Sequence, residues 1–134
     1  MKRYKPLFES LLTQTQITNK TWYHFTPIEN VESINKSGFK KSHNSIFGSG
    51  VYFYGKEVER KDKVAITCKV RLHKTLQSEY IAFPRLYTEL TGKRHNGLDG
   101  EEKELEKLGY DSVYIADEDW LVVFNPKNVK VAKK

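Results

Sequence analysis

Apolar and polar side chains alternate through residues 64–72. Every even position in this segment is apolar, and the odd positions Lys69 and Arg71 are charged. Successive side chains of a strand point to opposite faces, so this alternation is typical of a strand with one buried and one exposed face. A single strand cannot satisfy its own backbone groups or bury one face by itself. The chain must therefore build a sheet around this segment.

Other short segments supply the remaining elements. Strands rich in β-branched and aromatic residues are predicted over 21–26, 51–54, 112–116 and 120–124, with a last edge strand over 129–131. Helices are predicted over 6–13, from an N-cap at Thr26 to a C-terminal Gly38, over 84–90 and over 101–108. Short helices and strands mixed in this order indicate an α+β fold on antiparallel or mixed strands, not a doubly wound parallel sheet.

The length and composition indicate one soluble folding unit. The 134 residues, 38% of them hydrophobic and 30% charged, carry no repeat, low-complexity tract or linker, so we expect a single domain over 1–134. No stretch approaches the roughly 18 apolar residues of a membrane helix, and the N-terminus lacks an apolar signal region. We expect a cytoplasmic monomer without a membrane partner. Cys68 is the only cysteine, which excludes an intrachain disulfide and a cysteine-based zinc site.

The net charge of +6 is unevenly distributed. Six basic residues near the two ends account for it, namely Lys2, Arg3, Lys5, Lys130, Lys133 and Lys134. Between them, residues 33–75 hold ten basic and three acidic residues, whereas residues 76–119 hold five basic and eleven acidic ones. Two interpretations remain open: basic and acidic faces that are simply solvated, or a basic surface for phosphate or nucleic acid.

His24 is the polar residue with the most informative position. It lies within Trp-Tyr-His-Phe-Thr at 22–26, at the end of a predicted strand and directly before a predicted helix. The chain has no phosphate-loop, serine-hydrolase, zinc-protease or paired-cysteine motif, and Gly48-Ser-Gly50 does not form a dinucleotide fingerprint. Taken alone, His24 is either a core or capping histidine or a functional one. The other histidines lack cysteine partners or close carboxylates, so we expect no metal site.

Several segments, taken together, bear on whether His24 is functional. They are Tyr-His-Phe-Thr at 23–26, Asn30 with Ile34 and Gly38-Phe39, Phe47-Gly-Ser-Gly-Val-Tyr-Phe53, Gly109-Tyr-Asp-Ser-Val-Tyr114, and Val122-Val-Phe-Asn-Pro126. In order and spacing they resemble the ADP-ribosyltransferase superfamily of the poly(ADP-ribose) polymerase type. The resemblance covers roughly residues 21–131, and its most specific piece is Phe-Gly-x-Gly-Val-Tyr-Phe.

The resemblance implies a split sheet that grips NAD as substrate, with no metal. On this basis His24 would hydrogen-bond the ribose and nicotinamide side of NAD, and Tyr52 would stack on the nicotinamide ring. The backbone at Phe25, where the family usually has glycine, would hold the carboxamide. The other residues placed at the dinucleotide by the resemblance are Thr26, Gly50 and Phe53. Ordinary strand packing is the alternative interpretation of Tyr52 and Phe53.

The family's glutamate corresponds in position to Trp120, so the chain departs from the pattern there. Its role is to stabilise the cationic sugar as nicotinamide leaves, which requires a carboxylate near the anomeric carbon. Glu118 would share a face with Trp120 if the strand extended back that far, and Asp119 is the other neighbouring carboxylate. Alternatively the site is apolar here, as in family members that transfer one ADP-ribose or have lost activity.

These features together predict an NAD-dependent mono-ADP-ribosyltransferase. It would cleave the bond between nicotinamide and ribose and pass ADP-ribose to a protein or nucleic-acid acceptor. The catalytic residues expected from the resemblance are His24, Tyr52 and Glu118. The alternative is a weakly active or inactive module on the same fold that binds NAD, ADP-ribose or nucleic acid. The compact chain would suit a bacterial or phage effector.

Overall fold

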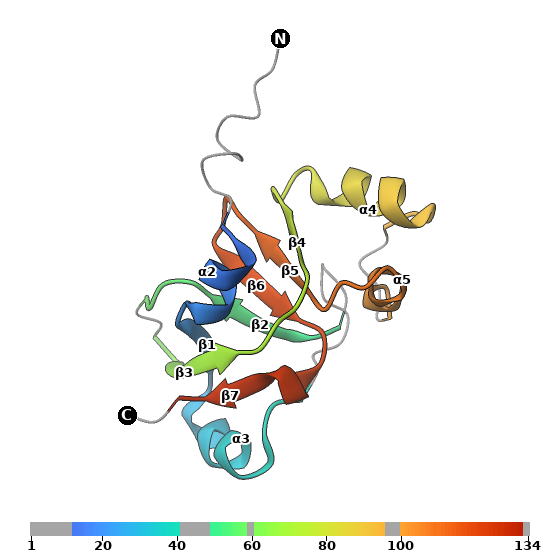
Figure 1. Cartoon of the computed structure of the whole chain (residues 1–134). Helices are drawn as coiled ribbons and strands as arrows, with labels where there is room; N and C mark the ends of the chain where they lie inside the picture. The colour runs from blue at the N-terminus through green and yellow to red at the C-terminus, as the bar shows by residue number, and fades with distance from the viewer. Residues whose placement is uncertain (1–11, 41–48, 59–60, 96–99, 133–134) are drawn as a thin grey trace.

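A seven-stranded sheet forms the centre of the protein (Figure 1). The computed structural model describes residues 12–40, 49–58, 61–95 and 100–132. The strands are β1 (Trp22–Thr26), β2 (Val51–Tyr54), β3 (Val64–Val70), β4 (Thr75–Ser78), β5 (Ser112–Ile115), β6 (Trp120–Val123) and β7 (Val129–Val131). They lie in the order β4-β5-β6-β2-β1-β3-β7, and all neighbours are antiparallel except the parallel pair β4 and β5. The α+β class with a mixed sheet is confirmed.

Short helices flank this sheet. They are α2 (Gln14–Asn19), α3 (Val31–Ser37), α4 (Phe83–Thr91) and α5 (Glu102–Lys107), with 3₁₀ turns η1 (Ile28–Asn30) and η2 (Pro126–Asn128). The helices predicted after Thr26, over 84–90 and over 101–108 are confirmed, with shifted ends. The helix predicted over 6–13 lies outside the described residues except for its last two positions, where Thr13 caps α2 through a capping box. None of the helices in the described ranges is long and apolar enough to cross a membrane.

The N-cap predicted at Thr26 is wrong. The chain enters the helix through the 3₁₀ turn η1, which has Pro27 at its N-cap position and no side-chain cap. Thr26 is instead the last residue of β1, where it is buried and its hydroxyl accepts a hydrogen bond from Asn30 Nδ2 at 3.4 Å. Gly38 ends α3 as predicted, with φ of 83° in the region that favours glycine.

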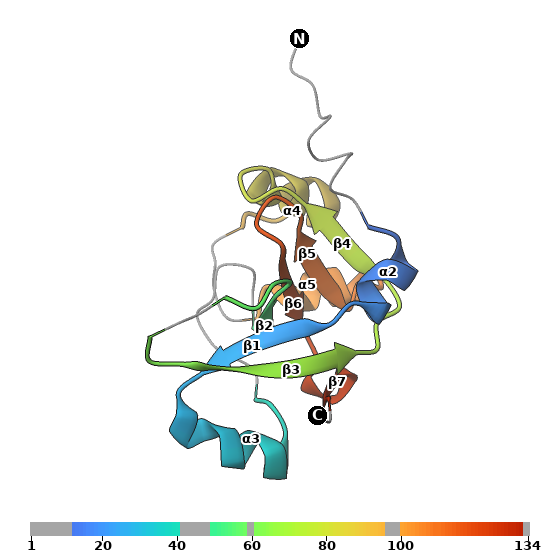
Figure 2. The same cartoon turned by 90° about the vertical axis from the view of Figure 1, so that its left-hand side faces the viewer.

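The two faces of the sheet bury separate apolar clusters. The first cluster includes Trp22, Phe53, Cys68 and Leu121, with the neighbouring residues of α2 and α3 packed on it. The second includes Val113, Val122 and Phe124 of the strands β5 and β6 and the segment after them, together with residues of α4 and α5. Figures 1 and 2 show α4 and α5 near the β4–β5 end of the sheet and α3 near β3. Successive residues of one strand therefore belong to different cores.

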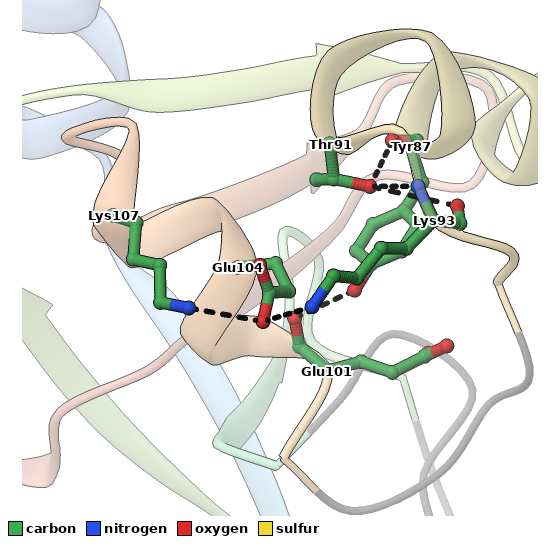
Figure 3. Close-up of polar contacts among 6 residues, drawn as sticks. All are labelled: Tyr87, Thr91, Lys93, Glu101, Glu104 and Lys107. Atoms are coloured by element: carbon green, nitrogen blue, oxygen red, sulfur yellow. Dashed lines mark hydrogen bonds and ion pairs between the residues drawn. The ribbon is translucent and has the colours of Figure 1, made fainter.

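Polar contacts join α4 to α5 (Figure 3). The Tyr87 hydroxyl donates to the Glu101 carbonyl at 3.0 Å, and Glu104 Oε2 accepts from Lys93 Nζ at 3.2 Å and Lys107 Nζ at 3.3 Å. These two hydrogen bonds hold the pKa of Glu104 below its ordinary value. Exposed pairs of this kind contribute little to stability, so the apolar cluster beneath holds the two helices together.

Candidate functional site

The sheet is interrupted between β1 and β2. β1 pairs with β3 at five positions and β2 pairs with β6 at four, but β1 and β2 are paired only at Tyr23 and Tyr54. Paired residues of an antiparallel ladder place their side chains on the same face, so this one pair fixes the facing of all later residues in both strands. His24 then lies on the face of Phe53, and Phe25 on the face of Tyr52.

His24 occupies the interrupted part of this ladder. Its Nδ1 lies 2.9 Å from the carbonyl oxygen of Tyr52. In an uninterrupted ladder, the partner of such a carbonyl is a backbone N–H of the neighbouring strand. A carbonyl oxygen only accepts, so Nδ1 carries the hydrogen and Nε2 of the neutral ring is an acceptor. The ring packs edge-on against Phe39 and Phe53, with centroids 4.8 and 5.9 Å away. The ring is therefore fixed in both orientation and tautomer.

The pKa of His24 is lowered. Burial among these aromatic rings is the main cause and outweighs the hydrogen bond to Tyr52, which acts in the opposite direction, while the positive charge of Lys63 lowers the pKa further. Burial disfavours the charged form of an imidazole. His24 is consequently neutral at pH 7, with a lone pair on Nε2.

A polar pocket of about 320 Å³ opens beside His24. It lies where β1 meets η1 and α3, and it is lined by His24, Thr26, Asn30, Ser33, Ile34, Gly38, Phe39 and Lys40. A neutral imidazole acceptor, a hydroxyl, an amide and an ammonium suit a ligand that carries both hydroxyl groups and negative charge. The sequence pattern identified His24 and Thr26 but missed Ser33 and Lys40 as lining residues. Ser33 could have been found from the sequence, because it lies one helical turn after Asn30 and would therefore share its face.

The structure does not bring the Tyr52 ring to this pocket. Tyr52 packs against the second apolar cluster, on the opposite face of the sheet from His24, and only its carbonyl oxygen reaches the imidazole. The Phe25 ring lies on the same face as Tyr52 and contacts Tyr54 edge-on at 5.1 Å. Phe53 is buried beneath His24, at 1% exposure. Of the expected site residues, His24 and Thr26 line one pocket, and Phe25 and Tyr52 lie across the sheet from it.

Gly50 has a packing requirement of its own. A Cβ on Gly50 would lie 2.7 Å from the carbonyl oxygen of Val123 and 2.9 Å from Val122 Cγ1. Real Cβ atoms essentially never come this close to a backbone oxygen, so only glycine lets β2 begin against β6 here. Gly50, the second glycine of the Gly-x-Gly-Val-Tyr-Phe motif, thus sets the start of the strand that carries Tyr52.

Glu118 does not share a strand face with Trp120. β6 begins at Trp120, so Glu118 lies in the exposed turn after β5, where its backbone N–H donates to the Ile115 carbonyl at 3.2 Å. Trp120 packs against Tyr54 and Tyr80, with centroids 6.1 and 5.8 Å away. The strand extension on which the face sharing of Glu118 depended is absent.

Asp119 is the carboxylate that the turn holds in place. Its backbone has φ of 59°, its Oδ1 accepts from the Tyr114 hydroxyl at 2.8 Å, and its carbonyl accepts from the N–H of Gly55 at 2.9 Å. Burial, together with this carboxylate, raises the pKa of Tyr114 well above its ordinary value. β2 lies between β6 and β1, so about 10 Å separates the strand that begins after Asp119 from the strand of His24.

A second histidine forms a polar pair that the sequence did not reveal. His95 Nδ1 lies 2.8 Å from Glu101 Oε1, and both side chains are about nine-tenths buried. Nearby, the buried Glu102 accepts from the backbone N–H of Ser49 at 2.8 Å. No three metal-ligating side chains converge anywhere in the described ranges. The pair lies beside α4 and α5, on the other face of the sheet from the His24 pocket.

No protein-family model matches the chain, and a search of curated proteins finds no similar sequence. The function must therefore be argued from the residues and their geometry.

His24 predicts that the fold loses stability as the pH falls from 7 to 5. Its folded pKa lies below the unfolded value of 6.5, so the unfolded chain takes up the proton first. The contribution of His24 to the free energy of unfolding is complete above the unfolded pKa of 6.5. It declines as the pH falls through this value, by at most about 1.4 kcal/mol per pH unit for one group. Urea midpoints at pH 7.5, 6 and 5 measure the decline.

His24→Asn is the matched variant for this measurement, because the asparagine amide retains a donor near Nδ1 and cannot titrate. The stability of this variant should fall less between pH 7 and 5 than the stability of the wild-type chain. An identical decline in both proteins would mean that another group causes it.

Proposed function

We propose that the chain is an NAD-dependent mono-ADP-ribosyltransferase that holds its dinucleotide where β1 and β2 part. The observation that carries this proposal is the hydrogen bond from His24 Nδ1 to the Tyr52 carbonyl at 2.9 Å. It leaves Nε2 as an acceptor on a ring that lines a polar pocket, and a ribose hydroxyl is a donor suited to it. The resemblance assigns this role to the same histidine.

The pocket chemistry supports one half of the dinucleotide. A volume of about 320 Å³ lies at the small end of ligand sites, so it accommodates a ribose with its phosphate and not the entire cofactor. Lys40 supplies the positive charge for the phosphate, and Asn30 and Ser33 supply hydrogen bonds for hydroxyl groups. The nicotinamide end would then extend along the interrupted ladder toward the backbone of Phe25.

In the proposed reaction, the bond between ribose C1′ and the nicotinamide nitrogen breaks and its electron pair leaves with neutral nicotinamide. The cationic sugar that remains bonds to a nucleophilic atom of the acceptor, which loses a proton. A carboxylate stabilises such a sugar electrostatically. Asp119 is hydrogen-bonded to Gly55, next to the paired Tyr54 and so at the closed end of the β1–β2 ladder, and Glu118 is exposed in the same turn. We expect one of these two carboxylates to act.

Binding without turnover is the second candidate function. Two placements favour it: the Tyr52 ring packs on the face opposite the pocket, and Glu118 lies in an exposed turn. A module of this kind would retain NAD or ADP-ribose at the His24 pocket and release no nicotinamide.

Nicotinamide release and calorimetric NAD binding, measured side by side, test both candidates. His24→Ala should weaken NAD binding about tenfold or more, the loss expected for one buried hydrogen bond with its positioning. His73→Ala is the matched control, because His73 is an exposed histidine outside the pocket. Glu118→Gln and Asp119→Asn should leave binding intact, and the one that acts in catalysis should lower nicotinamide release.

The outcomes separate the two functions. Release of nicotinamide with labelled acceptor supports the transferase. NAD binding that depends on His24, without release, supports the binding module and rejects the transferase. Absence of NAD and ADP-ribose binding rejects both.

A further inference from the structure

Four cationic side chains gather at the β3–β7 edge of the sheet. This basic edge comprises Lys69, Arg71, Lys127 and Lys130, all exposed, around a shallow hollow of about 360 Å³. Lys69 and Arg71 alternate with the buried Cys68 and Val70 of β3, so they lie on the face opposite the first apolar cluster. The edge is therefore on the other face of the sheet from His24.

The register of the two strands sets like charges against each other. Lys69 of β3 is directly opposite Lys130 of β7. Side chains in such pairs start about 5 Å apart, and like charges there destabilise a sheet. Lys69 Nζ donates to the Asn19 carbonyl and to Thr21 Oγ1, both at 3.1 Å and both neutral. Within the described ranges none of the four cations forms an ion pair, so an anionic ligand would offset their repulsion.

Protection of an edge strand explains only part of this arrangement. A lysine on an exposed edge strand discourages pairing with other chains, which accounts for Lys130 on β7. Lys69 lies on the interior strand β3, and Lys127 lies in η2, where no strand edge needs protection. A concentration of positive charge around one hollow is the feature that remains to be explained.

Aromatic side chains continue the same face. Thr67, two residues before Lys69, is paired with Tyr23 of β1, and Tyr23 is paired with Tyr54 of β2. Both tyrosines are half-buried. From β7 to β2 the face thus passes from cations to two tyrosines at paired positions. Cations that follow a phosphate backbone beside aromatic rings that stack on bases are the combination that binds single-stranded nucleic acid.

We propose that this face, formed by the basic edge with Tyr23 and Tyr54, binds single-stranded nucleic acid. The four cations contact phosphates, and the two tyrosines contact bases. An acidic peptide would satisfy the cations but would not use the two tyrosines, so the observations favour nucleic acid. The proposal does not depend on the His24 pocket, which lies on the opposite face.

Fluorescence anisotropy with a labelled 20-nucleotide oligouridylate, between 50 and 200 mM KCl, tests it. The variant Arg71→Gln/Lys130→Gln removes two cations and spares Lys69, which contacts the end of α2. It should bind about tenfold more weakly at 50 mM, and its salt slope should decrease by about 1.4, since each phosphate contact on a single strand contributes about 0.7. The control Lys36→Gln/Lys103→Gln removes two exposed lysines of α3 and α5 and should change affinity less than about twofold.

Tyr23→Leu tests the aromatic part. It should weaken binding about fivefold or more while leaving the salt slope unchanged, because a stacking contact releases no counterions. Circular dichroism and urea midpoints verify that each variant folds, and calorimetric NAD binding should be unaffected in the Arg71→Gln/Lys130→Gln protein. This last readout separates failure of the present proposal from failure of the proposed NAD site.

Three results would overturn the proposal. The first is an equal loss of affinity in both double variants, which would indicate net charge alone. The second is binding of a duplex of the same length as tightly as the single strand, and the third is tighter binding of polyglutamate than of oligouridylate.

Discussion

Gly55→Ala is expected to lower the free energy of unfolding by about 1–3 kcal/mol, the cost of overpacking a close contact. A Cβ on Gly55 would collide with the carboxylate of Asp119. That carboxylate cannot move aside freely, because the Tyr114 hydroxyl donates to it at 2.8 Å. The backbone cannot move freely either, because the Gly55 N–H donates to the Asp119 carbonyl and Asp119 has φ of 59°. Urea denaturation followed by circular dichroism measures the loss.

A double-mutant cycle identifies the cause. Asp119→Gly removes the carboxylate and accommodates the positive φ, so Gly55→Ala should cost much less in that background than in the wild-type chain. Gly92→Ala is the control, because a Cβ there meets nothing within 4 Å and the cost comes from its φ of 75° alone. Additive losses for Gly55→Ala and Asp119→Gly would contradict the predicted collision.

The strands that the sequence predicts well have a buried face encoded in their own residues. β3 alternates, and β2 and β6 are dense in β-branched and aromatic residues. β4, with the sequence Thr-Leu-Gln-Ser, was not predicted. It is a strand because it pairs in parallel with β5, about 37 residues away in the chain, where Thr75 is opposite Ser112. A short polar segment carries no local pattern for such a long-range pairing.

The candidate site illustrates why facing is harder to predict than position. The sequence places His24 at a strand end directly before a helix, whereas in the structure it is the central residue of β1 and η1 begins at Ile28. Whether His24 and Tyr52 face each other depends on register, and shifting a strand by one residue exchanges its two faces. The pairing of Tyr23 with Tyr54 directs Phe53 toward His24 and Tyr52 away from it. No short-range signal in either segment encodes that choice.

The prediction that Glu118 shares a strand face with Trp120 is wrong for a related reason. Glu118 and Trp120 share a face only within a continuous strand, and the left-handed residue Asp119 ends any such strand. Asp is among the few residues that tolerate this backbone region, so the Asp-Glu-Asp sequence is compatible with both a strand end and a turn.

Trp22→Ala is expected to cost about 3–5 kcal/mol, the range for removal of a large buried aromatic side chain. Trp22 is fully buried in the first apolar cluster, and its Nε1 donates to the Ile17 carbonyl at 3.0 Å. Its ring also meets Tyr114 edge-on at 5.8 Å. One side chain therefore joins α2, β1 and β5. A loss of this size is a large fraction of the stability of an ordinary domain, so the variant should be partly unfolded at 37 °C.

Trp22→Phe separates packing from the hydrogen bond. Phenylalanine keeps an aromatic ring in the cluster and removes the donor to Ile17, so the loss should be about 1–2 kcal/mol, from one buried hydrogen bond and some volume. Because His24 lies two residues further along β1 on the same face, a rigid strand should keep the His24 pocket intact in this variant. Unfolding midpoints and NAD affinity measured on the same protein decide this: a large loss of affinity in a folded Trp22→Phe chain would mean that the pocket depends on the indole and not on the strand.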